Sequence, residues 1–220
     1  MTLQITVRGS AEQHHRAERA NVWLAATVEG ADRTAVFRDA VAVQEPIASQ
    51  LKELTERDAV TTWSSDQVRV YSHRPWDADG KRQAMVHVAR VQVRAEFLDF
   101  ERLSGFLDYW SGNEGVEVGG VTWDVTAKNR RTYEAEVRKS AVDDAVAKAQ
   151  AYANAVRRGR VIAEQLADPG MLAGPSDEPV VGGRAFAAMS MDIGAGGPQL
   201  ELIPQEIVIH VDVDARFRAE

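Results

Sequence analysis

The sequence predicts an α+β fold in which three helices pack on a mainly antiparallel β-sheet. Short runs that alternate apolar and polar residues recur along the chain, and this pattern is typical of strands with one buried face. Three other segments repeat apolar residues every three or four positions, as amphipathic helices do. The predicted order is strand, strand, helix, hairpin, helix, strand, helix, strand, loop, strand. This order favours helices laid against antiparallel strands.

Two strands and a helix are predicted at the start of the chain. LQITVRG alternates, and after a polar link ANVWLAATVEG gives a longer strand that ends at Gly30. The next helix begins after the N-cap Asp32. Pro46 lies inside this helix, and because proline removes a backbone donor and clashes one turn back, we expect a kink or a restart there. The apolar stripe consists of Val36, Ala40, Val43, Ile47, Leu51 and Leu54.

A β-hairpin is predicted in the middle of the chain. DQVRVYSHRPW and QAMVHVARVQVRAEF both alternate, and the connection contains Asp79-Gly80, a pair that tolerates the positive φ of tight turns. A short amphipathic helix and the strand VEVGGVTWDVTA follow. The hairpin, helix and strand are consistent with a split βαβ topology. The apolar side of this short helix consists of Leu103, Phe106, Leu107 and Trp110.

The longest helix is predicted over roughly residues 130–158, where Gly159 supplies the stop. Small residues permit close approach, so we expect this helix to lie tight against a sheet or another helix. Its stripe is mostly alanine and consists of Tyr133, Val137, Ala141, Ala145, Ala149, Tyr152 and Val156.

Two further strands, RVIAEQL and LIPQEIVIHVDVDARF, complete the predicted fold. Residues 168–198 between them hold 7 of the 16 glycines and 4 of the 7 prolines, which predicts a long mobile loop. The whole chain of 220 residues is expected to form either a single domain or two intertwined α+β subdomains.

Composition excludes several classes of function. The net charge of −7 argues against the broad basic surface that nucleic acid requires, so no nucleic-acid partner is expected. Without cysteine there is no thiol nucleophile, thiolate metal site or disulfide. The start of the chain lacks the pattern of a secretory signal, and the longest apolar run is too short to span a bilayer. We therefore expect a cytoplasmic protein without membrane insertion.

Three stretches resemble the SIMPL-domain family. ITVRGSAEQHHRAERANVWLAATVEG resembles its opening, GVEVGGVTWDVT its central strand, and EVRKSAVDDAVAKAQAYANAVRRG its Ala-rich helix. The chain departs from the family in having Glu18-Arg19 where Pro-Asp is usual. Many relatives begin with a signal peptide, whereas none is expected from the pattern of MTLQITVRGS. The resemblance implies a non-enzymatic protein with no catalytic residues. Some members of the family assemble into a large ring-like or channel-like oligomer and are loosely linked to stress responses, so the resemblance implies self-association.

The closing strand EIVIHVDVDARF is the strongest candidate for a metal site, because His210, Asp212 and Asp214 share one face. Successive residues on a strand face lie roughly 6.6–7 Å apart, so these three need help from an adjacent strand to reach one ion. A solvated strand face is the favoured interpretation. The usual signatures of nucleophilic catalysis and of zinc or nucleotide sites do not occur, and no cofactor is expected.

Other candidate residues are histidines and exposed aromatic residues. His14 and His15 lie in the predicted polar link, and His73 and His87 lie on the predicted hairpin. A disordered loop is the favoured interpretation for residues 168–198, and the alternative is that Phe186, Met189 and Met191 dock onto the body of the protein or onto a second subunit. Trp76 at the hairpin tip is a further candidate for contact with a partner. Two hypotheses follow. The first is a homo-oligomeric scaffold or assembly protein, and the second is a small-ligand or metal-binding protein that uses the last strand and the hairpin histidines.

Overall fold

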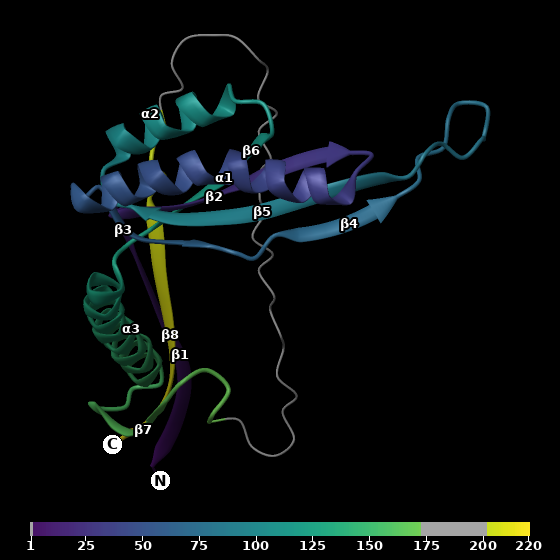
Figure 1. The fold of residues 1–220 in the computed structure, drawn as a ribbon. Coiled ribbons are helices and arrows are strands. Elements are labelled where there is room, and N and C mark those ends of the chain that lie inside the picture. Colours follow the sequence, from purple (N-terminus) through teal and green to yellow (C-terminus); the bar gives the residue numbers. More distant parts are fainter. Residues whose placement is uncertain (1, 173–201) are drawn as a thin grey trace. The chain divides into compact units, whose positions relative to one another are not determined.

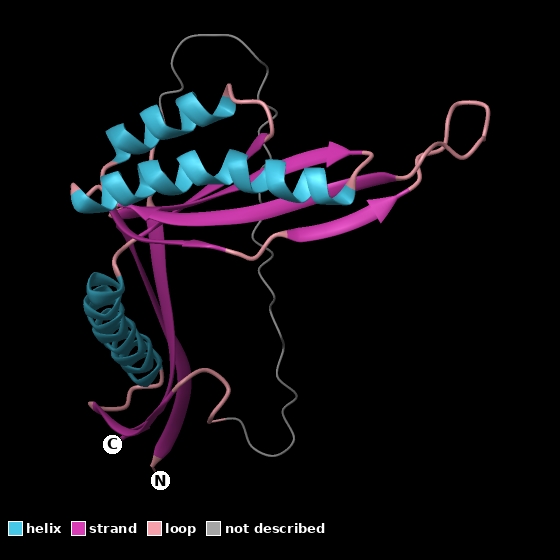
Figure 2. Ribbon diagram, viewed as in Figure 1, coloured by secondary structure: helices cyan, strands magenta, loops and turns pink. Residues whose placement is uncertain are grey.

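The computed structural model describes residues 2–172 and 202–220, and its elements form two compact units (Figure 1, Figure 2). One unit contains β1 (Leu3–His15), α3 (Ala127–Ala155), β7 (Val161–Ala167) and β8 (Ile207–Ala219). The other contains β2 (Arg19–Gly30), α1 (Arg33–Glu56), β3 (Val60–Ser65), β4 (Arg69–His73), β5 (Val86–Phe97), α2 (Phe100–Ser111) and β6 (Val116–Asp124). All paired strands are antiparallel, which confirms the predicted α+β class.

The unit of residues 17–124 is a sheet in the order β3-β5-β2-β6 with α1 and α2 on one face (Figure 1). β5 and β6 flank β2 and are both antiparallel to it, so they run parallel to each other. α2 connects them, which is the predicted split βαβ arrangement. The core beneath the helices includes Leu24, Ile47, Leu51, Phe97 and Phe106.

Strand β3 was not predicted. It pairs with residues 93–97 of β5, while β4 pairs with residues 86–90, so the two short strands follow one edge of β5 in succession. The run VTTWSS has a single apolar residue on each side of its alternation, which gives little local signal. Pairing with β5 and the packing of Trp63 against the core hold this strand in place.

Helix α1 begins as predicted. The carboxylate of Asp32 accepts hydrogen bonds from the backbone N–H groups of Thr34 and Ala35. The helix continues through Pro46 without a restart. Pro46 is exposed, so the backbone carbonyl one turn earlier, which loses its helical partner, faces the solvent side.

In the other unit, α3 packs on the sheet β1-β8-β7. The alanine stripe is buried as predicted, but near the end of the helix the buried residue is Ala153, whereas Tyr152 is 60% exposed and Val156 is 57% exposed. After Ala149 the next buried residue is therefore four positions on, at Ala153, and not three positions on, at Tyr152. The helix ends at Ala155, earlier than expected.

Strand β1 is longer than predicted. It runs through the supposed polar link to His15 because all thirteen of its residues pair with β8, from Leu3 opposite Ala219 to His15 opposite Ile207. The predicted loop over residues 168–198 lies largely outside the described residues. No helix in the described part of the chain is long and apolar enough to cross a membrane.

Candidate functional site

The metal candidates lie on the face of the three-stranded sheet that points away from α3. Ile209, Val213 and Phe217 of β8 are buried toward the helix, so the alternate residues His210, Asp212 and Asp214 point the other way. The adjacent strand is β1, which places Glu12, Ser10 and Arg8 opposite these three residues in turn. β1 is thus the neighbouring strand that the sequence left undetermined.

Asp214 is engaged by a cation and a backbone donor. Arg8 donates from Nε to Oδ1 over 2.7 Å and from Nη2 to Oδ2 over 3.1 Å, and the backbone N–H of Gly170 donates to Oδ2 over 2.7 Å. The hydrogen bond from Arg8 lowers the pKa of Asp214, and the Gly170 N–H lowers it further, while burial acts in the opposite direction. Both carboxylate oxygens are therefore occupied by protein donors.

Asp212 and His210 contact each other and β1. The Ser10 hydroxyl donates to Oδ1 of Asp212 over 2.6 Å, and His210 Nε2 lies 3.1 Å from the same oxygen. The hydrogen bond from Ser10 lowers the pKa of Asp212, against the effect of burial. Among the described residues no three His, Cys, Asp or Glu side chains are grouped to hold a metal ion. The arrangement is a ladder of hydrogen bonds and ion pairs across two strands.

The other histidines do not converge either. His14 and His15 belong to β1, not to a link, and the His15 ring stacks on Tyr133 with centroids 3.6 Å apart. His87 Nδ1 lies 2.6 Å from the hydroxyl of Ser72, its partner in the hairpin, whereas His73 is opposite Val86. Because adjacent residues of a strand face opposite ways, His73 and His87 lie on opposite faces of the hairpin.

The predicted hairpin forms an arm, defined here as residues 69–85 of β4 and the connection to β5, that extends past the N-terminal end of α1 (Figure 1). Its turn has Gly80 at φ 73°, and the Asp77 carboxylate accepts hydrogen bonds from the backbone of Asp79 and Lys81. Three large apolar side chains of this hairpin arm are exposed: Tyr71 by 53%, Trp76 by 62% and Met85 by 43%.

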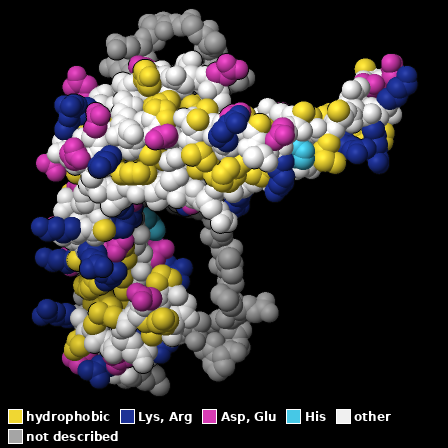
Figure 3. Space-filling model, viewed as in Figure 1, with side chains coloured by type: hydrophobic (Ala, Val, Ile, Leu, Met, Phe, Trp, Pro, Cys, Tyr) yellow, Lys and Arg dark blue, Asp and Glu magenta, His cyan; other side chains and the backbone are white. Residues whose placement is uncertain are grey.

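Basic side chains accompany the apolar residues on the hairpin arm, as Figure 3 shows. The Arg82 guanidinium lies 5.0 Å from the centre of the Trp76 ring, a cation–π contact that holds the indole at the tip. The other residues predicted to contact a partner, Phe186, Met189 and Met191, lie outside the described residues.

The free edge of β1 is protected in its middle by helix α3. The Asp144 carboxylate accepts a hydrogen bond from the backbone N–H of Ser10 over 2.8 Å, and Lys148 Nζ donates to the carbonyl of Arg8 over 3.1 Å. These two side chains form an ion pair of 2.6 Å one helical turn apart. They satisfy the backbone groups that an added strand would use, so this edge is blocked there.

A second exposed tryptophan, besides the Trp76 that the sequence favoured, lies on the five-stranded sheet. Trp23 is 44% exposed and points away from the helices, against Gly119 and Gly120 of β6. The signal was the glycine pair in the middle of a predicted strand, because a glycine inside a strand often marks a bulge or a close approach.

These features define an α+β protein with two compact units, one an antiparallel sheet with α3 on one face and the other an antiparallel sheet with α1 and α2 on one face. The sequence model of the SIMPL family, described as "Protein of unknown function (DUF541)", matches residues 5–217, nearly the whole chain. The chain belongs to the SIMPL family. No curated protein matches it.

Proposed function

We propose that this chain is a non-enzymatic assembly protein that associates with further copies of itself through the hairpin arm. The observation that carries the proposal is the exposure of Tyr71, Trp76 and Met85 on one short projection. A two-stranded ribbon beyond the helices has little core of its own, and clustered exposed apolar side chains favour contact with another protein surface. Aromatic residues beside arginine are also enriched at the centres of protein interfaces.

Charge favours a second copy of this chain as the partner. The hairpin arm, residues 69–85, contains four basic residues and two acidic residues, a net charge of +2, in a chain whose total is −7. The remainder of each copy therefore carries −9 and attracts the arm of another copy. The blocked middle of the β1 edge supports the arm, rather than that strand, as the contact element.

The test is the native mass of the full chain by light scattering. We expect a mass that is a multiple of 24.2 kDa. The double variant Trp76→Ser/Met85→Ser removes two exposed side chains of the arm and should shift the mass toward 24.2 kDa. Neither side chain is buried in the core, so the fold should persist and circular dichroism should be unchanged.

Tyr152→Ser is the matched control, because Tyr152 is as exposed as Trp76 but lies on α3. This variant should keep the wild-type mass. A wild-type chain that stays at 24.2 kDa at all concentrations contradicts the proposal, as does a control variant that dissociates as readily as the arm variant.

A further inference from the structure

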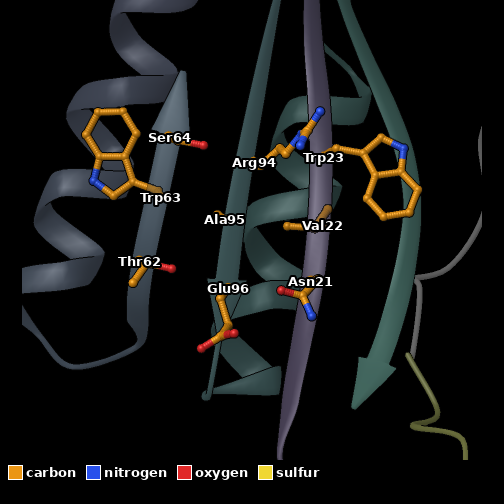
Figure 4. Close-up of a pocket in the computed structure, with 9 residues that line it drawn as sticks. All are labelled: Asn21, Val22, Trp23, Thr62, Trp63, Ser64, Arg94, Ala95 and Glu96. Atoms are coloured by element: carbon orange, nitrogen blue, oxygen red, sulfur yellow. The ribbon is translucent and has the colours of Figure 1, made fainter. Parts of the chain in front are cut away.

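The five-stranded sheet has a polar outer face, opposite the face that α1 and α2 cover. Val22, Val93 and Ala95 are buried toward the helices, so their neighbours along each strand point outward. There a shallow hollow spans three adjacent strands (Figure 4). The outward side chains that line this outer hollow are Asn21 and Trp23 from β2, Thr62 and Ser64 from β3, and Arg94 and Glu96 from β5.

A glycine bulge shapes one end of the outer hollow. Between the pairs Val22–Val121 and Leu24–Val118, β2 has one residue, Trp23, and β6 has two. These two are Gly119 and Gly120. A Cβ atom on Gly119 would lie 2.8 Å from the Trp23 carbonyl oxygen and closer still to the indole. The indole therefore rests against the β6 backbone, and its exposed fraction of 44% leaves the side away from β6 accessible (Figure 4).

Most polar side chains of the outer hollow are available to a ligand. Ser64, Arg94 and Trp23 lie in one row across β3, β5 and β2. In the part of the chain that the structure describes, the side chains of Asn21, Thr62, Ser64 and Arg94 make no hydrogen bond or ion pair with other residues. Glu96 lies in the next row, between Thr62 and Asn21. Its carboxylate accepts from Arg19 over 2.7 Å and from Thr61 over 2.6 Å, so each oxygen already has one protein donor and a ligand would use the remaining lone pairs.

We propose that the outer hollow binds a neutral, β-linked oligosaccharide, with one sugar ring stacked on Trp23. The axial C–H groups of such a sugar are slightly positive and suit the negative face of an aromatic ring. Sugar hydroxyls both donate and accept, and the outer hollow offers a donor in Arg94, an acceptor in Glu96, and groups that do both in Asn21, Thr62 and Ser64. A chain of equatorially linked rings is extended, which suits the open outer hollow across three strands.

Charge and shape favour a neutral extended chain over the alternatives. A polyphosphate or a polyuronate requires an excess of cations, whereas the outer hollow has one arginine and one glutamate in a protein of net charge −7. A small compact ligand requires a concave site that covers most of its surface. The outer hollow is shallow and open, which suits an internal segment of a longer chain. This binding is separate from the hairpin arm and does not depend on self-association.

The experiment is calorimetric titration of the full chain with cellohexaose and with chitohexaose, two neutral β-linked oligosaccharides. We expect at least one of them to bind. Trp23→Ala and Arg94→Gln should each weaken that binding by about tenfold, since each removes a contact of the order of 1.4 kcal/mol. Trp23→Phe keeps an aromatic face and should bind with intermediate affinity. Trp76→Ala, an exposed tryptophan elsewhere, is the control and should bind as the wild type does.

Circular dichroism and the melting temperature establish that each variant is folded. If Trp23→Ala does not fold, Trp23→Phe and Arg94→Gln decide the matter, because both keep the packing on β6. The proposal is overturned if neither oligosaccharide binds, or if binding depends on Trp76 and not on Trp23. It is also overturned if oligogalacturonate or oligothymidylate binds more tightly than both neutral sugars, since the site would then be one for anions.

Discussion

At the scale of single residues, a glycine determines how closely helix α3 approaches its sheet. Gly9 of β1 lies directly beneath α3, where an added Cβ would meet the carbonyl oxygen of Ala141 and lie 2.7 Å from the Cβ of Ala145. The alanine stripe of the helix and this glycine together allow the close approach that the sequence predicted. The sequence did not indicate which residue of the sheet the helix would press on.

Gly9→Ala should therefore destabilise the protein. The helix must move or the backbone must shift, and such overpacking lowers the free energy of unfolding by about 1–3 kcal/mol. Gly105→Ala is the matched control, because Gly105 lies in α2 with nothing within 4 Å of an added Cβ. It should raise the free energy of unfolding by roughly 0.5–1 kcal/mol. Urea denaturation measures both, and equal effects of the two substitutions would contradict the proposed packing.

The Arg8–Asp214 pair should make stability depend on pH. The pKa of Asp214 is lower in the folded chain than in the unfolded chain. The ionised carboxylate therefore stabilises the fold fully above the unfolded pKa of about 3.9, and this contribution is lost as the pH falls through the lower folded value. Asp214→Asn should lower the free energy of unfolding by about 1–3 kcal/mol near pH 6 and by less near pH 3, below the unfolded pKa.

Urea denaturation of the wild type and Asp214→Asn at the two pH values checks this sign. Asp143→Asn serves as the control, because Asp143 is exposed on α3 and makes no ion pair within the described ranges 2–172 and 202–220. A difference between wild type and Asp214→Asn that grows on acidification would show that the carboxylate does not stabilise the fold in its ionised form.

At the scale of elements, the sequence predicted the features that depend on neighbouring residues, such as caps, turns and helix stripes. The N-cap of α1, its apolar stripe and the Asp79-Gly80 turn are all found where the sequence indicated them. β3 and the second half of β1 were missed because pairing with a distant strand, rather than alternation, holds them extended. Pro46 was expected to interrupt α1, yet the packing of Ile47, Leu51 and Leu54 in the core carries the helix across it.

Pro46→Ala should consequently stabilise the protein. The substitution restores a backbone donor for the carbonyl one turn earlier and removes the clash of the ring, for a gain of up to about 3 kcal/mol in the free energy of unfolding. Pro75→Ala is expected to act in the opposite direction. Pro75 lies in the hairpin connection outside any helix or strand, where proline reduces the freedom of the unfolded chain by roughly 0.4–1 kcal/mol. A destabilised Pro46→Ala variant would mean that α1 depends on the proline.

At the scale of the whole molecule, topology is what the sequence could not supply. β1 and β8 lie far apart in the sequence and pair along their full length. One compact unit is therefore built from the first and last parts of the sequence, and the other unit from residues that come between them along the chain. No local pattern encodes that pairing. For the same reason the closing strand alone could not show that Asp214 pairs with Arg8 and Asp212 with Ser10. The same holds for Trp23. The sequence contains Gly119 and Gly120, but it does not indicate that they pair with the strand of Trp23.

Charge at this scale leads to a last prediction about assembly. If the basic hairpin arm binds the acidic remainder of another copy, the attraction weakens as the screening length falls from about 10 Å at 0.1 M salt to about 3 Å at 1 M. The native mass should then decrease toward 24.2 kDa with rising sodium chloride, as light scattering would record. Contact between apolar side chains alone would not weaken in this way, since salt does not screen it. A native mass that stays constant or increases with salt would contradict the role of charge. Apolar contact through Tyr71, Trp76 and Met85 would then account for the association.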